Sequence, residues 1–121
     1  RIRDEEQKEM FVLCVEDDTC KVVAEGEVER KKRWIERHVA EIRFGVLPGH
    51  EIAAKQMVGQ LITTAKDNGL EVLFYFHLES QTNGMQIMKD LGFEQIGKLS
   101  NYYKLANGGY VDRVFLSKQL T

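Results

Sequence analysis

The sequence predicts an α/β (α+β) domain: a mixed β-sheet with helices packed on it, in the element order β-β-β-α-β-α-β-β. Three observations predict this class. Several short runs alternate apolar and charged residues, which is typical of strands, and residues 51–68 carry apolar side chains at three- and four-residue spacing, which is typical of a helix. Residues 70–78 then form an almost continuous apolar run, which indicates a central strand covered on both faces. A strand, a helix and a strand in succession make the two strands parallel.

The composition is that of one globular domain. The 121 residues are 43% hydrophobic and 30% charged, enough for a single compact core. The net charge of -2 argues against a nucleic-acid partner bound through a broad basic face, and no apolar run is long enough to span a membrane. Cys14, Cys20 and three scattered histidines do not have the spacing of metal ligands. We expect reduced thiols, no metal and a cytoplasmic location.

The first half of the chain predicts a hairpin and a third strand. Residues 10–15 and 22–28 are strand-like, and the Asp17-Asp18-Thr19 segment between them has turn chemistry. Residues 38–47 form the next strand, in which Gly45 indicates a bulge or a close backbone approach. Alternation places Val39, Glu41 and Arg43 on one face of this strand, and Ala40, Ile42 and Phe44 on the other.

The second half predicts two helices and three strands. The helix over residues 51–68 ends at Asn68, with Gly69 as a left-handed cap. A second helix over residues 82–91 is followed by the cap residue Gly92. The strands that remain are residues 70–78, residues 93–99 with a continuation over 102–105 after a bend, and residues 110–116.

A basic cluster follows the second strand. The residues from Arg30 to Arg33 are all Arg or Lys. One interpretation is a solvated strand end or loop, and the other is a surface that meets an acidic partner. The sequence leaves both open.

Three phrases carry a resemblance to a known family. They are HVAEIRFGVLP at residues 38–48, DLGFEQIG at residues 90–97, and GYVD with LSK at residues 109–112 and 116–118. In this order and spacing they resemble a strand leading to the cofactor loop, the end of the last helix and the closing strand of the GNAT superfamily of acyl-CoA-dependent N-acyltransferases. The resemblance covers residues 10–120.

The resemblance implies a cofactor, acetyl-CoA or another acyl-CoA, and a place for it. In the family, two parallel strands separate at their carboxyl ends, and the pantetheine arm lies between them. Here the gap is expected between residues 44–47 and 75–78, with the diphosphate at the amino end of the following helix. The implied cofactor-binding positions are Phe44, Gly45, Val46, Leu47, Glu51, Ile52, Ala53, Ala54, Lys55, Gln56, Gln81 and Met88.

The cofactor loop departs from the family pattern R/Q-x-x-G-x-G/A. Its positions hold Glu51, Ala54 and Gln56. The two side chains that replace glycine obstruct a close approach of the backbone to phosphate, and Glu51 would repel a diphosphate. We expect weakened binding, by about one to three powers of ten at roughly 1.4 kcal/mol each. His50 and Lys55 are the residues that could compensate.

The resemblance also suggests catalytic residues. Residues 40–44, AEIRF, resemble the family phrase A-E-I-V-F, which makes Glu41 the candidate base. The alternative is that Glu41 pairs with Arg43. Met88 occupies the position of the tyrosine that protonates the departing thiolate in many members, and a thioether donates no proton. Whether Tyr102, Tyr103 or Tyr110 replaces that hydroxyl stays open.

Two functions remain after these arguments. One is an N-acetyltransferase that acts on an amine of unknown identity, and the other is a non-catalytic GNAT-fold module for acyl-CoA sensing or protein contact. Family members usually begin with a strand and two helices on the acceptor side, whereas residues 1–9 are a short charged segment. We therefore expect one domain over residues 1–121, truncated at the amino end, with a homodimer partner or a domain before Arg1 as alternatives. We expect no nucleic-acid or membrane partner.

Overall fold

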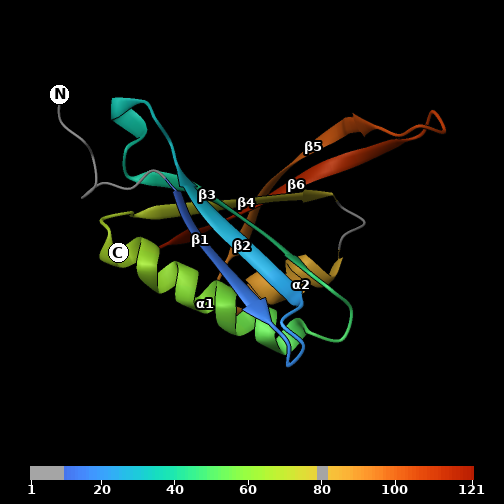
Figure 1. Ribbon diagram of the computed structural model, residues 1–121. Helices are drawn as coiled ribbons and strands as arrows, with labels where there is room; N and C mark the ends of the chain where they lie inside the picture. The colour runs from blue at the N-terminus through green and yellow to red at the C-terminus, as the bar shows by residue number, and fades with distance from the viewer. Residues whose placement is uncertain (1–9, 79–81) are drawn as a thin grey trace.

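The computed structural model describes residues 10–78 and 82–121. Over these residues a single six-stranded sheet has both helices on the same face (Figure 1). The order of elements agrees with the sequence prediction, apart from one added short helix. The strands are β1 (Met10–Glu16), β2 (Val22–Arg30), β3 (Val39–Val46), β4 (Val72–Leu78), β5 (Glu94–Lys104) and β6 (Tyr110–Gln119), and the helices are the 3-10 helix η1 (Trp34–Glu36), α1 (Glu51–Asp67) and α2 (Thr82–Asp90).

The spatial order of the strands is β1-β2-β3-β4-β6-β5. The pair β3 and β4 is parallel, as the strand–helix–strand order predicts, and the other four neighbouring pairs are antiparallel. Helix α1 connects the two parallel strands. This places the carboxyl ends of β3 and β4 at the same end of the sheet, near the start of α1 (Figure 1).

The helices divide the sheet into a covered face and an open face. On the covered face, Ile42 and Leu73 are fully buried beneath the apolar stripe of α1, which includes Leu61. Gly26 allows this helix to approach closely, because a Cβ there would be 2.9 Å from the Leu61 methyl group. The opposite face carries half-exposed side chains, Arg43 among them. We call it the open face of the sheet.

Several predicted turns and caps are confirmed. Gly69 and Gly92 end the two helices with φ values of +86° and +97°. The bend inside β5 is an irregularity of register between Leu99 and Tyr103, where Asn101 has a φ of 55°. Asn101 is held there by a hydrogen bond from its backbone N–H to the Asp112 carboxylate at 2.8 Å.

Two expectations were wrong, and one short element was not predicted. The register of β2 and β3 runs without a shift through Gly45, and a Cβ there would meet nothing within 4 Å, so Gly45 marks neither a bulge nor a close approach. Strand β4 is buried on one face only, since Phe74 and Phe76 lie half-buried on the open face. Helix η1 forms in the basic segment, where the sequence has no apolar periodicity to indicate it.

Neither described helix has the length and apolar content that a membrane crossing requires. Over the same residues, no group of His, Cys, Asp and Glu is placed to hold a metal ion.

Candidate functional site

The central feature of the site is a separation of β3 and β4. The two strands pair only over Val39–Val72, Ala40–Leu73 and Glu41–Phe74. Beyond this point β3 stays paired with β2 as far as Val46, and β4 stays paired with β6 as far as Leu78. Each strand follows its outer neighbour, so a gap opens between their carboxyl ends (Figure 1). This separation was expected from the resemblance and is present.

The β3 side of the gap presents unpaired backbone groups. The N–H of Leu47 donates to the carbonyl oxygen of Val23 on the β2 side, at 2.9 Å. Backbone groups of a strand alternate in direction, so those of Phe44 and Val46 point into the gap. The amide of Leu47 is therefore not available to a ligand there, and Gly45 likewise points toward β2.

On the β4 side of the gap the backbone groups also alternate in direction. The carbonyl oxygen of Glu71 accepts a hydrogen bond from the N–H of Leu120 on the β6 side, at 2.8 Å. The backbone groups of Phe76 and Leu78 consequently point toward β3. The gap thus has hydrogen-bonding backbone on both edges, which suits an extended ligand that contains amide groups.

Three stacked rings lie on the covered-face side of the gap. Phe44 of β3 stacks on Tyr75 of β4 with ring centroids 5.6 Å apart, and Tyr75 stacks on His77 at 5.4 Å. A Cβ on Gly84 in α2 would lie 2.5 Å from the Tyr75 hydroxyl oxygen, so the glycine makes room for that group. Burial raises the pKa of Tyr75 to about 12.

Sequence reasoning did not select Tyr75 or His77. The available signal was two polar groups at alternate positions of an otherwise apolar strand.

The amino end of α1 lies at the same end of the sheet as the gap. The first hydrogen bond of this helix runs from the N–H of Ala54 to the carbonyl oxygen of His50, at 3.0 Å. The N–H groups of the residues from Glu51 to Ala53 are therefore not used within the helix, which favours an anion. The Glu51 carboxylate lies in the same turn, 3.4 Å from the N–H of Gly49, and opposes an anion.

The other residues of the predicted cofactor loop differ in how exposed they are. Ile52 is 78% exposed and Gln56 is exposed, whereas Ala54 is fully buried, so its methyl group packs in the core instead of obstructing phosphate. The ammonium of Lys55 lies 3.5 Å from the Asp90 carboxylate and ties α1 to α2. Any contact of Lys55 with a ligand would have to displace that pair.

Two predicted cofactor contacts do not enter the site that we propose. Met88 has no exposed surface and is part of the hydrophobic core, so its side chain offers nothing to a ligand. Gln81 lies outside the described residues. We therefore leave both out of the site that we propose.

Glu41 lies on the open face, in the last paired position before β3 and β4 separate. Its carboxylate is 3.2 Å from the guanidinium of Arg43 and 4.0 Å from the ammonium of Lys31, and its side chain is 18% exposed. The pairing with Arg43 that the sequence left as an alternative is thus present. It does not remove Glu41 from the edge of the gap, and the carboxylate would exchange a contact to engage a ligand.

Arg43 joins three carboxylates on the open face. It donates to Glu27 at 2.8 Å and to Glu29 at 2.6 Å, besides its contact with Glu41. Partial burial acts to lower the pKa of Arg43, but the hydrogen bonds to Glu29 and Glu27 and the charge of Glu41 outweigh it, and its pKa is raised. The hydrogen bond from Arg43 and its charge lower the pKa of Glu29.

The three tyrosines considered as thiolate donors belong to the β5–β6 hairpin, which extends away from the helices (Figure 1). The Tyr102 hydroxyl accepts a hydrogen bond from Arg113 at 3.2 Å, and the Tyr102 and Tyr103 rings pack edge-on at 5.0 Å. Tyr110 is 56% exposed near the tip. Tyr102 is nevertheless connected to β4, because Arg113, its hydrogen-bond donor, also lies over the Phe76 ring, with the guanidinium carbon 4.3 Å from the ring centroid.

Comparisons with known proteins show which solved structures share this geometry. No protein-family model and no curated protein matches the sequence. Solved structures do match. A probable acetyltransferase from Staphylococcus epidermidis superposes with a TM-score of 0.82 at 18% identity, over 98% of this chain and 72% of that one. The acetyltransferase of GNAT family from Streptococcus pneumoniae gives 0.84 at 13% identity, over 96% and 69%.

The chain has the GNAT fold. A third structure of this fold, the putative acetyltransferase yncA from Salmonella typhimurium with its cofactor acetyl-CoA, gives a TM-score of 0.82 at 19% identity, over 91% of this chain and 64% of that one. The resemblance stated from three sequence phrases is thereby confirmed at the level of the fold. The activity of this particular GNAT-fold chain is a separate question, because identities of this size establish the fold alone.

Proposed function

We propose that this chain binds an acyl-CoA in the gap between β3 and β4 and transfers the acyl group to an amine. The observation that carries the proposal is the end of β3–β4 pairing after Glu41 and Phe74. Parallel strands seldom give up their hydrogen bonds without another partner, because an unpaired buried backbone group costs free energy. An extended thioester arm supplies such a partner. The yncA structure, which holds acetyl-CoA in the same fold, supports this reading.

The backbone groups at the gap fit the pantetheine arm of the cofactor better than the start of α1 fits its diphosphate. The pantetheine arm contains two amides, and Phe44, Val46 and Phe76 present backbone groups to it from both edges of the gap. The diphosphate would meet the free N–H groups at the start of α1, but also the Glu51 carboxylate. We therefore expect acyl-CoA to bind, with an affinity limited by the repulsion between Glu51 and phosphate.

The chain's own groups supply positioning and a base. The bound cofactor would provide a thioester carbonyl that an amine can attack. The N–H groups of Phe44 and Val46, which point into the gap, would be the donors available to polarise that carbonyl. Glu41, at the point of separation, would take a proton from the ammonium so that the neutral amine can attack. The C–S bond of the thioester would then break, and the departing CoA thiolate would take up a proton from solvent. Arg43 holds the Glu41 carboxylate in place.

Cofactor binding is tested by thermal unfolding and calorimetry with CoA and acetyl-CoA. Ligand at a hundredfold excess over its Kd stabilises the folded state by about 2.7 kcal/mol, which raises Tm by roughly 10 °C for a domain of this size. 3'-Phosphoadenosine 5'-diphosphate is the control, since it has the phosphates of CoA, the diphosphate included, and lacks the arm that the gap would hold. No stabilisation by CoA at millimolar concentration would contradict the proposal.

Catalysis is tested by a matched pair of variants, Glu41→Gln and Glu29→Gln. Both carboxylates contact Arg43, but only Glu41 stands at the point of strand separation. Glu41→Gln should lower kcat by about 100-fold or more while the CoA affinity stays unchanged, because it removes a proton acceptor and little volume. Glu29→Gln should leave kcat within a few-fold. Equal effects of the two changes would remove Glu41 from the base role.

A non-catalytic acyl-CoA-sensing module is the second candidate. The observation that favours it is the engagement of Glu41 by Arg43 and Lys31, together with the burial of Met88 where a donor hydroxyl would be useful. The two candidates differ in one measurement. A sensing module would bind acetyl-CoA and release no CoA thiol when small primary amines and lysine peptides are added.

A further inference from the structure

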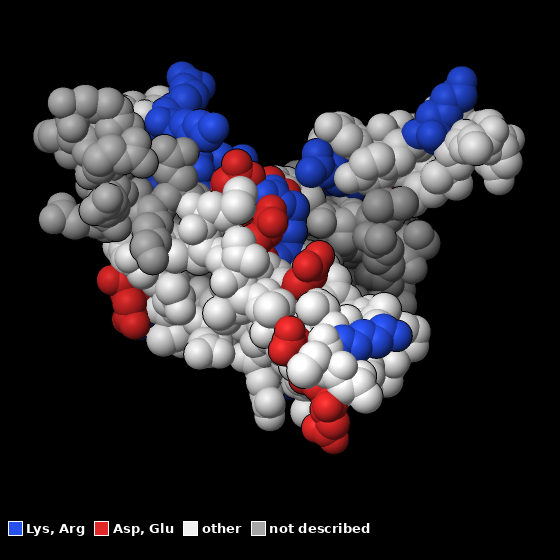
Figure 2. All heavy atoms as spheres, viewed as in Figure 1, with Lys and Arg blue, Asp and Glu red and all other residues white. Residues whose placement is uncertain are grey.

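The connection between β2 and β3 forms a rigid, charged projection at the end of the sheet opposite the gap. We call residues 31–38, with η1 in their middle, the basic projection. It stands out from the body of the molecule in Figure 1, and Figure 2 shows Lys and Arg side chains gathered on it. Lys32, Arg33 and Arg37 on it are exposed, and Glu36 is its one acidic residue. The rest of the chain therefore carries more negative charge than the overall value of -2 suggests.

Two large apolar side chains lie among these cations and outside the hydrophobic core. Trp34 is 71% exposed and Ile35 is 68% exposed, and η1 contributes no buried residue to the core. Exposed tryptophan beside arginine is the composition of the energetic centre of a protein interface.

The projection is held in one conformation. The Arg37 guanidinium lies 3.7 Å from the centroid of the Trp34 ring and donates to the Trp34 carbonyl oxygen at 2.8 Å. Arg30 then fixes Arg37 by donating to its carbonyl oxygen at 2.6 Å, and reaches Asn68 at the end of α1 at 2.9 Å. An anchor ordered in advance loses little conformational entropy when a partner binds.

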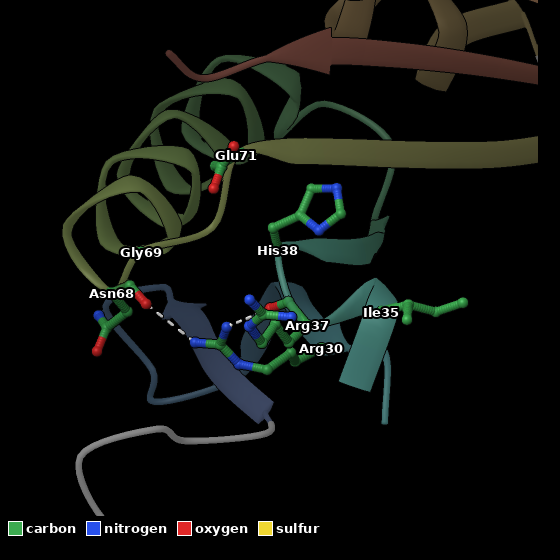
Figure 3. A pocket seen from close by; sticks show the side chains of 7 residues that line it. All are labelled: Arg30, Ile35, Arg37, His38, Asn68, Gly69 and Glu71. Carbon is green, nitrogen blue, oxygen red and sulfur yellow. Dashed lines mark hydrogen bonds between the residues drawn. The ribbon is translucent and has the colours of Figure 1, made fainter. Parts of the chain in front are cut away.

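A pocket of about 540 Å³ adjoins the projection (Figure 3). Ile35, Arg37 and His38 line it on the side of the projection, and Glu71 lies opposite them. Its volume is in the range that holds a bulky side chain or a small ligand. The surface thus combines exposed cations, an exposed tryptophan and an adjacent hollow.

We propose that the basic projection docks a short acidic segment of a partner protein that also carries a bulky apolar side chain. The carboxylates pair with Lys32, Arg33 and Arg37, and the apolar side chain packs on Trp34 or enters the pocket.

The positively charged surface is small and has acidic residues beside it, which favours a peptide over a membrane or a nucleic acid as the partner. Glu29 and Glu41 adjoin it on the open face, and Glu71 lies in the pocket. Figure 2 shows Asp and Glu side chains close to the Lys and Arg side chains at this end of the molecule. A membrane plane or a long nucleic acid would extend over them and be repelled, whereas a peptide of a few residues would not.

Trp34 is the only tryptophan of the sequence, so its fluorescence reports on this surface alone. The probe is a short synthetic peptide in which Asp and Glu alternate with Phe and Leu. Binding should shift the Trp34 emission and should weaken between about 50 and about 200 mM salt, because exposed charges are screened. A peptide with Lys in place of Asp and Glu, vesicles of phosphatidylserine and phosphatidylcholine, and a single-stranded oligonucleotide are the comparison ligands.

Variants localise the binding. Lys32→Glu with Arg33→Glu should raise the Kd of the acidic peptide by about 10-fold or more, and Ile35→Ser by several-fold. Lys104→Glu, a single charge reversal at an exposed position of the β5–β6 hairpin, should leave it within about two-fold. No spectral change with millimolar acidic peptide, equal binding of the basic peptide, tighter binding of vesicles or oligonucleotide, or an equal effect of Lys104→Glu would each overturn the proposal.

Discussion

Arg43→Met tests the charge network that holds Glu41 at the gap. Methionine keeps most of the aliphatic stem of arginine and removes the guanidinium, which contacts Glu27, Glu29 and Glu41 at 2.8, 2.6 and 3.2 Å. Glu29 and Glu41 are direct neighbours across β2 and β3. Like charges in directly opposed positions destabilise a sheet, and Arg43 is the cation between them.

The magnitude follows from exposure. The Arg43 side chain is 39% exposed, and those of Glu27 and Glu41 are 35% and 18% exposed, so solvent screens these pairs. Half-exposed pairs contribute about 0.2–1 kcal/mol each, and the repulsion left behind adds to the loss. We expect the free energy of unfolding at pH 7 to fall by about 1–2 kcal/mol and Tm by roughly 4–8 °C. Urea unfolding measures the first quantity and differential scanning calorimetry the second.

The pH dependence gives the sharper result. The pKa of Glu29 is lowered from its ordinary value of 4.5 by Arg43, so the stability from this pair is present above about pH 4.5 and is lost as the pH falls through the lowered value. In Arg43→Met the pair is missing, and protonation relieves the repulsion among the carboxylates. The difference between the two proteins should therefore be largest near pH 7 and smallest near pH 3.

The control for Arg43→Met is Lys104→Met. Lys104→Met also removes one positive charge, but from an exposed position whose ammonium lies 5.8 Å from the centroid of the Tyr110 ring, so its unfolding free energy should change by less than about 0.5 kcal/mol. Equal stability of Arg43→Met and the parent at pH 7 would refute the network argument. So would a difference that stays constant from pH 7 to pH 3.

Two further predictions concern packing and the cofactor loop. Gly97→Ala places a Cβ 2.5 Å from the Phe115 ring and should lower the free energy of unfolding by about 1–3 kcal/mol, whereas Gly45→Ala, with no atom within 4 Å, should change it by less than about 0.5 kcal/mol in the same urea titration. Glu51→Arg with Gln56→Gly should tighten CoA binding by about 10-fold in calorimetry, because a repulsive carboxylate becomes a charge-assisted donor. An unchanged CoA affinity would show that this loop does not face the diphosphate.

Strand β4 shows where sequence reasoning succeeds and where it stops. Its apolar run and its place after α1 were enough to predict a central strand parallel to β3. The same run suggested cover on both faces, yet Phe74 and Phe76 are half-buried on the open face. Hydrophobicity along a strand says that both faces avoid water, but it does not say which other elements are present to exclude it.

In the candidate site, too, one part could be predicted from the sequence and another could not. The alternation of β3 placed Glu41 and Arg43 on one face, and this could be predicted because side chains alternate along any strand. That Arg43 also bridges Glu27 and Glu29 depends on the register of β2 against β3, which local sequence does not specify.

The sequence by itself determined the order of the strands and helices, the parallel pair and the caps at Gly69 and Gly92. These follow from local periodicity and from backbone conformations that few residues adopt. The resemblance predicted that β3 and β4 separate, but the tertiary structure alone decided that they do so after Glu41 and Phe74, that Tyr75 and His77 lie under the opening, and that Trp34 is left in solvent. The reason is physical. Strand pairing, ring stacking and side-chain exposure are set by contacts between segments that are distant in the chain, and a local sequence pattern does not specify which distant segments meet.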